Sequence, residues 1–401
     1  MHIPSYVNVI IERLMASGHK AYIVGGSLRD MLLGRSPSDF DVTTSALPEE
    51  TLELFSDMRT IPTGLKHGTV TVLSDNEPIE VTTFRKDGEY LDSRHPESVS
   101  FTSDVCEDLS RRDFTVNAIA YNENSGIVDP YLGREDIKNK IIRAVGDPNK
   151  RMQEDALRIM RALRFSAQLG FTIEEKTKKA LSSNKEGLIN VSRERIGVEM
   201  AKLIVSPYAK EAIDIMIDMG ICKYVLDTYM PSERCILMLN SLPSDFYLRF
   251  SALLWDCEPD TARDILSSLK YSNAQKSGVI SILRSRSLPL NTDGADARRV
   301  IIALGEHSEA AAMLLSAFEE APQSFADKIN ELLKTEFARK ISDLRISGND
   351  LITLGFKGKE IGTVLEELFG IVTEEPSLNT KEQLTEIIKS KDFLKRYGKN
   401  N

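Results

Sequence analysis

The sequence predicts an α+β fold class, in which a mixed N-terminal domain is followed by an all-helical remainder. Runs that are typical of strands occur only in the first third of the chain. After about residue 141, apolar residues recur at helical spacing between short turns. A length of 401 residues also favours more than one domain. The expected strands are 21–24, 69–73, 79–83 and 117–121, and examples of expected helices are 28–33, 236–242, 262–269, 300–304 and 310–318.

Composition narrows the class of protein. The net charge of −9 argues against a chain coated in positive charge, but residues 151–202 carry 11 Lys and Arg against 7 Asp and Glu. The four cysteines and five histidines lack the spacing of metal ligands, and no His-Asp dipeptide of a phosphohydrolase occurs. No signal peptide and no apolar run of roughly 20 residues is apparent. We therefore expect a cytoplasmic protein with no membrane association and no obligate protein partner.

A glycine turn after the first expected strand is followed by two aspartates. Gly25 and Gly26 let the backbone approach a phosphate closely. If Phe40 lies in a strand, Asp39 and Asp41 share one face. Two adjacent carboxylates suit Mg²⁺, which also binds substrate phosphates. Each motif alone is typical of an ordinary turn or loop, but their order and short separation favour a nucleoside triphosphate site with its metals.

A second polar motif precedes the expected strand 117–121. The adjacent Arg111 and Arg112 can hold phosphate oxygens, and Asp113 or Asn117 can bind a ribose hydroxyl. Taken alone, the motif is better explained as a charged entry into a strand.

A third motif is predicted to be one helix over 154–165, with four apolar residues at spacing i, i+3, i+4, i+7. Arg158 and Arg161 lie off this apolar face, and Asp155 precedes Arg158 by one turn. Cytosine and adenine present an exocyclic amine beside a ring-nitrogen acceptor, whereas uracil and guanine present the reverse. A fixed carboxylate and arginine would therefore accept C and A and refuse U and G. The alternative is an i,i+3 salt bridge worth about 0.2–0.5 kcal/mol.

In this order the motifs resemble the class II tRNA nucleotidyltransferases, the family of the bacterial CCA-adding enzymes, within the wider nucleotidyltransferase and poly(A) polymerase family. The match spans about the first half of the chain, and the ordered set is far more specific than any one of its members. The segments that carry the resemblance are 25–30, Asp39, Asp41, 111–115, Asn117-Ala118, Asp129-Pro130, Gly133, 154–158, 161–165 and 192–196 with Glu199.

The resemblance implies a seahorse-like protein built from four parts. The head, 1–142, would be a nucleotidyltransferase palm, and the neck, 143–205, would carry the helices that recognise the base. The body, 206–325, and the tail, 326–401, would be all-helical, with the tail binding tRNA.

The resemblance also implies roles for individual residues. Asp39 and Asp41 would bind two Mg²⁺ ions as cofactors, and Glu80 is the best candidate for a third catalytic carboxylate. Asp155 and Arg158 would serve as an amino-acid template for the incoming base. The full set expected to contact the nucleotide is Gly25, Gly26, Ser27, Arg29, Arg111, Arg112, Asp113, Asn117, Asp155, Arg158, Arg161 and Arg164.

The implied reaction is template-independent addition of CCA to the 3′ end of tRNA from CTP and ATP, with release of pyrophosphate. Bacterial poly(A) polymerase is the nearest alternative, and the template-like pair and the lack of a strongly basic C-terminal run oppose it. Enzymes that add only CC or only A are further alternatives. The segment 84–96 resembles a flexible loop that CC-only relatives lack, which favours A addition. The presence of both aspartates opposes a catalytically silent RNA-binding protein.

The tail contains a second pattern that suits phosphate binding. Ser347 with Asp350 predicts a helix N-cap, the helix is expected to stop at Gly355, and Gly358 and Gly362 flank the start of the next helix. Backbone N–H groups at such a junction can hold phosphates of an RNA backbone. A plain hairpin of two helices explains the pattern equally well.

Overall fold

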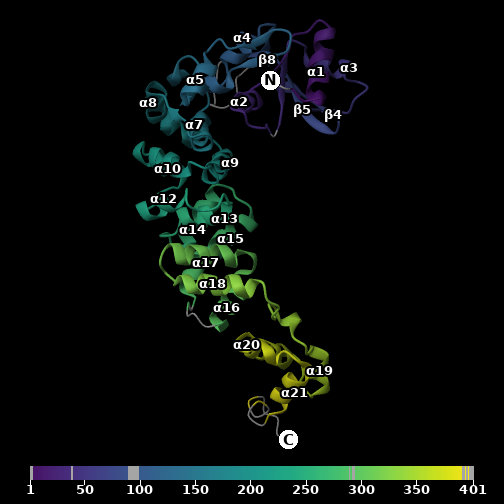
Figure 1. Cartoon of the computed structure of the whole chain (residues 1–401), viewed down its shortest axis with the longest axis vertical. Coiled ribbons are helices and arrows are strands. Elements are labelled where there is room, and N and C mark those ends of the chain that lie inside the picture. The colour runs from purple at the N-terminus through teal and green to yellow at the C-terminus, as the bar shows by residue number, and fades with distance from the viewer. Residues whose placement is uncertain are drawn as a thin grey trace. The chain divides into compact units, whose positions relative to one another are not determined.

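The protein divides into two compact units, which are described separately. The first comprises Met1–Met230 with Ser268–Lys270, and the second comprises Pro231–Ser267 with Tyr271–Asn401 (Figure 1). A computed structural model describes residues 3–37, 39–88, 99–288, 290, 294–390, 393 and 396. Most of the predicted flexible loop, 84–96, lies outside these residues.

A mixed sheet of seven strands forms the centre of the first unit, as far as its described residues extend. The strand order is β3-β4-β5-β2-β1-β8-β9, in which β2 and β5 run parallel and all other neighbours run antiparallel. A short hairpin, β6–β7, stands outside this sheet. The bounds are β1 Ala21–Val24, β2 Asp41–Thr44, β3 Thr60–Gly64, β4 Thr69–Ser74, β5 Glu77–Thr83, β6 Arg85–Asp87, β7 Val99–Phe101, β8 Ala120–Asn122 and β9 Gly126–Val128.

Helices complete the first unit. α1 (Ser5–Ala16) and α3 (Pro48–Leu54) pack against the sheet, and α2 (Gly26–Leu32) follows β1 directly. α7 (Leu157–Leu169) is buried along most of its length and packs against α9 and α10. The other elements are α4 Val105–Ser110, α5 Gly133–Asn139, α6 Pro148–Glu154, α8 Glu175–Asn184, α9 Arg193–Ile204, α10 Ala209–Asp218, α11 Cys222–Val225 and the 3-10 helices Leu65–His67, Thr115–Asn117 and Lys185–Asn190.

The register at the centre of the sheet explains where the polar residues meet. All four residues of β1 are buried, which anchors the glycine turn that follows them. Antiparallel pairing places Val24 opposite Asp41, and parallel pairing places Glu80 opposite Asp41. The sheet therefore brings the glycine turn and two carboxylates to one edge, although more than 50 residues of sequence separate its outermost members.

The predicted strand 117–121 is wrong over its first part, because Thr115–Asn117 forms a 3-10 helix and β8 begins only at Ala120. The side chain of Asn117 bridges Arg29 and Asp113 by hydrogen bonds, and the tight turn presents it to both partners. Asp39 also lies before β2 rather than within it. The strands predicted at 21–24, 69–73 and 79–83 are confirmed.

The single helix predicted over 154–165 is also wrong. The chain is extended at Asp155, with φ −145° and ψ 102°, so α6 ends there and α7 begins two residues later. The Asp155 carboxylate accepts a hydrogen bond from the N–H of Leu157 at 3.0 Å, which satisfies one donor at the start of α7. Strand pairing also continues past residue 141, since β10 (Ile141–Ile142) runs parallel to β11 (Thr172–Ile173).

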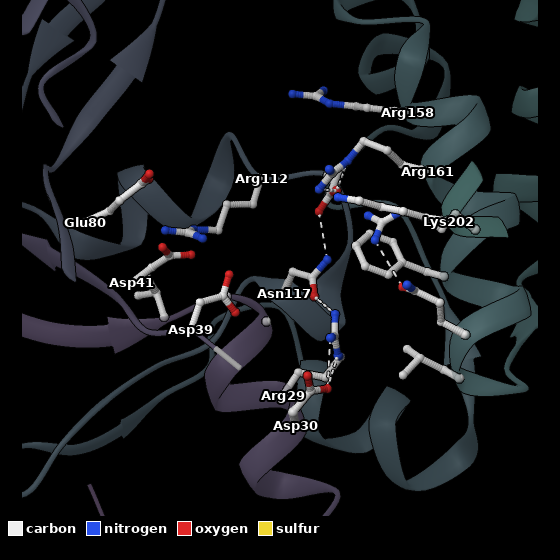
Figure 2. Close-up of a pocket in the computed structure, with 18 of the residues that line it drawn as sticks. Arg29, Asp30, Asp39, Asp41, Glu80, Arg112, Asn117, Arg158, Arg161 and Lys202 are labelled. Carbon is white, nitrogen blue, oxygen red and sulfur yellow. Dashed lines mark hydrogen bonds and ion pairs between the residues drawn. The ribbon is translucent and has the colours of Figure 1, made fainter. Parts of the chain in front are cut away.

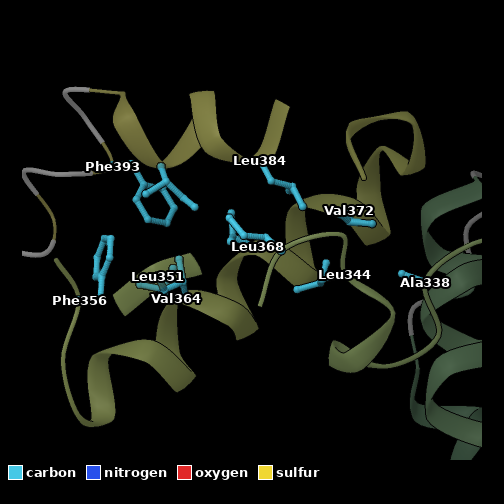
Figure 3. Packing of buried hydrophobic residues seen from close by; sticks show 11 residues of the cluster. Ala338, Leu344, Leu351, Phe356, Val364, Leu368, Val372, Leu384 and Phe393 are labelled. Atoms are coloured by element: carbon cyan, nitrogen blue, oxygen red, sulfur yellow. The ribbon is translucent and has the colours of Figure 1, made fainter. Parts of the chain in front are cut away.

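The second unit consists of helices and turns throughout its described residues. Its C-terminal part has a core of its own, in which α19, α20 and α21 direct apolar side chains toward one another (Figure 3). The helices are α12 Glu233–Met238, α13 Phe246–Leu253, α14 Pro259–Ser268, α15 Asn273–Arg284, α16 Gly294–Leu304, α17 Ser308–Ala317, α18 Gln323–Leu333, α19 Gly348–Thr353, α20 Lys359–Glu374 and α21 Lys381–Lys389. Short 3-10 helices are Ser285–Ser287, Gly305–His307, Ile341–Asp343 and Pro376–Leu378.

The predicted helix junction in the tail is confirmed. The Asp350 carboxylate accepts from the N–H of Ser347 at 2.8 Å, and the Ser347 hydroxyl accepts from the N–H of Asp350, so the two residues form a reciprocal cap. Gly355 and Gly358 both adopt positive φ, at +92° and +57°, where glycine is favoured. These residues fix the turn between α19 and α20.

One described stretch, Gly294–Ala317, is long and apolar enough to cross a membrane by length and composition alone. This differs from the expectation that no such run exists. In the structure the stretch is divided by the 3-10 turn Gly305–His307 into α16 and α17, whose apolar residues include the buried Val300 and Leu314. The buried apolar side chains of this stretch therefore contribute to packing within the second unit.

Two helical glycines predict opposite effects of an added methyl group. A Cβ at Gly197 in α9 would lie 2.3 Å from the carbonyl oxygen of Leu269, whereas a Cβ at Gly362 in α20 would meet no atom within 4 Å. We expect Gly197→Ala to destabilise the fold by about 1–3 kcal/mol, because a backbone atom cannot move aside. Gly362→Ala should be neutral or stabilising by up to about 1 kcal/mol. Urea unfolding of both variants checks this, and equal effects would contradict the packing described.

Candidate active site

One cavity of about 910 Å³ in the first unit is lined by the central strands, the glycine turn, the segment 111–117 and helices α7 and α9 (Figure 2). Of the site residues predicted from the sequence, the cavity lining lacks only Ser27. The Ser27 side chain is buried, and its hydroxyl donates to the carbonyl oxygen of Val24 at 3.0 Å, so it stabilises the turn instead. The predicted residues at the cavity are Gly25, Gly26, Arg29, Asp39, Asp41, Glu80, Arg111, Arg112, Asp113, Asn117, Asp155, Arg158, Arg161 and Arg164.

At Gly25 the backbone passes close to charged groups of the cavity. Its φ of +76° lies in the left-handed region, where a side chain is strained. A Cβ at this position would also lie 3.3 Å from Nη1 of Arg112 and 3.7 Å from Oδ2 of Asp41. The turn thus requires glycine for its conformation and for space, and it leaves backbone beside both an arginine and a carboxylate.

Carboxylates gather at this end of the cavity. Figure 2 shows Asp39, Asp41 and Glu80 around the space that Arg112 also enters. Although Asp41 keeps exposed surface, desolvation by the surrounding cavity walls raises its pKa, the charges of Glu80 and Asp39 raise it further, and Arg112 opposes them, so that the pKa is about 6. Within the described residues, no group of three or more His, Cys, Asp and Glu side chains is close enough to complete a metal site. The crowded negative charge nevertheless favours a bound cation.

Arg111 and Arg112 are both held by Asp108, which is completely buried. Asp108 Oδ1 accepts from Nε and Nη2 of Arg111 at 3.0 and 2.8 Å, and Oδ2 accepts from Nη2 of Arg112 at 3.3 Å. Burial alone would raise the pKa of Asp108, but the two arginines outweigh it and lower the pKa. The arginine side chains keep 17% and 18% of their surface exposed, and both line the cavity.

A chain of hydrogen bonds runs across the floor of the cavity. Arg29 Nη1 donates to Oδ1 of Asn117 at 2.8 Å, and Asn117 Nδ2 donates to Oδ1 of Asp113 at 3.2 Å. Arg161 Nε then donates to Oδ2 of Asp113 at 2.8 Å. Burial would raise the pKa of Asp113, but Arg161 and Asn117 outweigh this effect and lower it to about 2. The four residues connect α2, the 3-10 helix at 115–117 and α7.

Three arginines surround the ring of Phe165 on α7. The guanidinium carbons of Arg29, Arg161 and Arg164 lie 5.2, 5.2 and 4.0 Å from the ring centroid. Arg164 also pairs with Glu199 of α9 at 2.5 Å. These contacts spread positive charge over an aromatic face and limit the positions that the arginines can adopt.

Asp155 and Arg158 both line the cavity, but they do not form the i,i+3 ion pair considered from the sequence. Asp155 Oδ2 accepts from Nη2 of Arg195 on α9 at 2.8 Å. Arg158 Nη1 donates to Oε2 of Glu154 at 2.8 Å, and its Nη2 donates to the carbonyl oxygen of Arg111 at 3.0 Å. The structure thus gives each side chain a separate support, from Arg195 for Asp155 and from Glu154 and the backbone of Arg111 for Arg158.

Sequence reasoning missed some residues of this site. Gln168 accepts from Nη1 of Arg164 at 3.0 Å, and Lys202 extends from α9 toward Arg161 (Figure 2). Asp108 was also missed, although its position three and four residues before two arginines is a signal for a helical ion pair. Gln168 and Lys202 give no comparable signal, since only the packing of α7 against α9 brings them to the cavity.

Family models match two parts of the chain. Residues 21–143 match the poly A polymerase head domain, and residues 170–231 match a domain described as the probable RNA and SrmB-binding site of polymerase A. The first match contains the glycine turn, the carboxylates and the arginine pair. The second overlaps α8 to α11.

Relatives match over nearly the whole chain. The CCA-adding enzyme of Geobacillus sp. (strain WCH70) is 38% identical over 368 residues, which is 90% of each chain, and that of Lactobacillus helveticus is 36% identical over 96% of each. The crystal structure of the Bacillus stearothermophilus CCA-adding enzyme in complex with CTP superposes with a TM-score of 0.84 at 31% identity, covering 99% of this chain and 100% of that one. The chain belongs to the family of bacterial CCA-adding enzymes, which are nucleotidyltransferases.

Proposed function

We propose that this protein adds CCA to the 3′ end of tRNA without a nucleic-acid template, using CTP and ATP and releasing pyrophosphate. One observation carries the proposal: a single cavity is lined by carboxylates and arginines suited to a triphosphate and, on α7, by polar side chains suited to a base edge. The named relatives support the same activity, and structures of such enzymes include complexes with CTP and with tRNA.

Asp39 and Asp41 are proposed to hold Mg²⁺, with Glu80 as the third carboxylate. The family generally uses a divalent metal. The raised pKa of Asp41 supports a cation here, because a positive ion would relieve the repulsion among the carboxylates. Mg²⁺ keeps several water and phosphate ligands, so two or three carboxylates are sufficient. When bound, the metal would supply charge stabilisation at the reacting phosphate.

The residues of the chain would divide the remaining work. Arg111 and Arg112 would bind the triphosphate beside the glycine turn, and Asp113 or Asn117 would bind the ribose. Asp155 would accept from the exocyclic amine shared by cytosine and adenine, while Arg158 would donate to the ring nitrogen. The contacts of Arg158 to Glu154 and to a backbone carbonyl would hold its guanidinium in place for this selection.

Two narrower activities are alternatives, namely addition of only A or of only CC, and poly(A) polymerase is a third. The loop segment 84–96 that would favour A addition lies mostly outside the described residues, so the choice depends on activity. Incubation of tRNA lacking its 3′ end with α-labelled CTP and ATP, separately and together, tests all of them. Full CCA addition is expected, whereas addition of only one nucleotide type, or of long A tails, would contradict the proposal.

We propose that the head, neck, body and tail have separate roles in the reaction. α7 and α9, which fall within the proposed neck at 143–205, line the cavity and would supply the residues that face the base. The proposed body, 206–325, contains the boundary between the two compact units at residue 230.

We also propose that the protein is cytoplasmic, because tRNA is processed there.

Removal of either proposed metal ligand should abolish addition of both nucleotides. We expect Asp39→Ala and Asp41→Ala to keep less than roughly 1% of wild-type turnover, because charge on the phosphate would no longer be stabilised. Affinity for tRNA should change little, since most contacts would lie on the helical regions. Asp57→Ala is a matched control, because Asp57 is an exposed carboxylate paired with Arg13 away from the cavity. Near-normal turnover with Mg²⁺ in either first variant would refute the metal assignment.

The raised pKa of Asp41 predicts that its ionised form, which would bind the metal, destabilises the fold when no metal is present. The folded-state pKa of about 6 lies above the ordinary value of 3.8, so the stability gained from protonation is full below about pH 4 and is lost as the pH rises through 6. In EDTA near pH 8, Asp41→Asn should therefore raise the melting temperature by roughly 2–4 °C, which corresponds to about 1 kcal/mol for an accessible carboxylate.

The melting temperature of the wild type and of Asp41→Asn, measured by calorimetry in EDTA across pH 4 to 8, tests this directly. If the melting temperatures of the two proteins differed by the same amount at every pH, ionised Asp41 would not destabilise the fold, and the prediction would be wrong.

The base-template hypothesis predicts changes in selectivity. Asp155→Ala and Arg158→Ala should each lower kcat/KM for CTP and ATP by roughly ten- to hundredfold, because a hydrogen bond to a charged group is worth roughly 1.5–3 kcal/mol. Discrimination against UTP and GTP should weaken, and the residual activity should still need Mg²⁺. Arg143→Ala, which removes an arginine outside the cavity, is the control. Wild-type selectivity in both test variants, measured with all four nucleotides, would refute the hypothesis.

A further inference from the structure

The buried carboxylate of Asp108 is surrounded by hydrogen-bond donors from several separate segments. Besides the two arginines, its Oδ2 lies 3.3 Å from the hydroxyl of Thr43, which it shares with the carbonyl oxygen of Thr82 at 3.2 Å, and its Oδ1 faces the backbone N–H of Arg85 at 3.4 Å. A carboxylate offers about four lone-pair sites, and these donors use them fully. The donors come from β2, from the start of β6 and from the arginine pair at the end of α4. A single buried group thus connects three parts of the cavity wall.

The position of Thr43 links Asp108 to the catalytic strand. Thr43 lies two residues after Asp41 on β2, so both side chains are on the same face of the sheet. Arg112 lies between the two aspartates, because its Nη2 contacts Asp108 and its Nη1 lies over the glycine turn near Asp41. Asp108 therefore holds one end of an arginine whose other end is beside the proposed metal ligand.

We propose that Asp108 is a positioning residue for the nucleotide triphosphate, acting through Arg111 and Arg112. Two neighbouring guanidinium groups repel each other, and one buried carboxylate between them fixes both while it offsets their charge. Without that carboxylate, Arg112 would be free to move toward Asp41, where it would compete with a cation. The proposal rests on the proposed function, since it assumes that the arginine pair binds phosphates of CTP and ATP.

The direct test is Asp108→Asn, which keeps the shape of the side chain and removes its charge. We expect KM for CTP and for ATP to rise about tenfold or more by the same factor, with a smaller change in kcat. The preference for CTP over UTP should not change, because base recognition would occur on α7. Calorimetric titration with CTP should show the same loss of affinity. Unchanged KM values with both nucleotides would overturn the proposal.

Asp136→Asn is a matched control for the loss of a buried charge. Asp136 is also buried, binds the guanidinium of Arg143 and accepts from the hydroxyl of Thr115 at 2.7 Å, but it does not line the cavity. This variant should lose stability while its KM for CTP stays within about twofold of wild type. An equal rise in KM in the two variants would mean that Asp108 acts only through stability, and the proposal would fail.

A double-mutant cycle separates positioning from general damage. Once Arg112 is replaced in Arg112→Met, the further change Asp108→Asn should cost far less than it does in the wild type, because one of the groups that it positions is gone. Full additivity would contradict the proposal. If Asp108→Asn does not fold, Thr43→Val removes one hydrogen bond to Asp108 without exposing a charge. It should raise KM for both nucleotides about two- to fivefold, and no rise would overturn the proposal.

The outcome can be separated from that of the proposed function. If the wild-type protein transfers neither C nor A to tRNA, the proposed function fails. Calorimetric titration with CTP then still reports whether Asp108 supports the binding of a triphosphate, and equal affinity of wild type and Asp108→Asn would overturn the inference independently.

Discussion

The ionised Asp113 is the contact on which the geometry of the cavity depends. It ties Arg161 of α7 to Asn117, which in turn binds Arg29 of α2, so three elements that are distant in sequence share one hydrogen-bonded chain. Since the carboxylate is buried and both of its oxygens are used, removing a member would leave an uncompensated charge, which commonly costs several kcal/mol. The chain fixes α7, which carries the proposed base-reading residues, relative to the glycine turn that follows β1. The proposed chemistry needs this fixed separation, because one nucleotide must reach both ends of the cavity at once.

Two aspartates of the same cavity are shifted in opposite directions by their surroundings. Desolvation, with a smaller effect of the neighbouring carboxylates, raises the pKa of Asp41 to about 6, while Arg161 and Asn117 lower that of Asp113 to about 2. The charge of Asp41 is offset only in part, by Arg112, whereas that of Asp113 is fully compensated by the protein. Negative charge that the protein leaves uncompensated suits a cation supplied with the substrate. A carboxylate whose charge is balanced within the protein, such as that of Asp113, is suited to holding structural elements together. The role proposed for Asp108 belongs to the second kind, because its charge is balanced by the arginines that it holds.

The sequence predicted the fold class, and all of its candidate site residues except Ser27 line the cavity, because strand periodicity, the glycine turn and polar residues at strand ends are local signals. It failed where tertiary contacts decide the local structure. The helix predicted across Asp155 is broken, since that carboxylate accepts from the N–H of Leu157 at the start of α7 and binds Arg195, which is 40 residues away. The strand predicted from Asn117 begins only at Ala120, and Asn117 ends a 3-10 helix in which its amide binds the nearby Asp113 and the distant Arg29. Ser27 supports the turn rather than the cavity, a distinction that no sequence pattern contains.

The central claim is that one cavity holds both the triphosphate and the base, with separate residues for each. A crystal structure of this protein with CTP and Mg²⁺, and a second one with ATP, would test it most directly. The account predicts the phosphates beside Gly25, Arg111 and Arg112, and the amine edge of either base at Asp155 and Arg158 in the same position. A base that lies away from α7, or two bases bound at different places, would contradict the claim even if the phosphates were found as described.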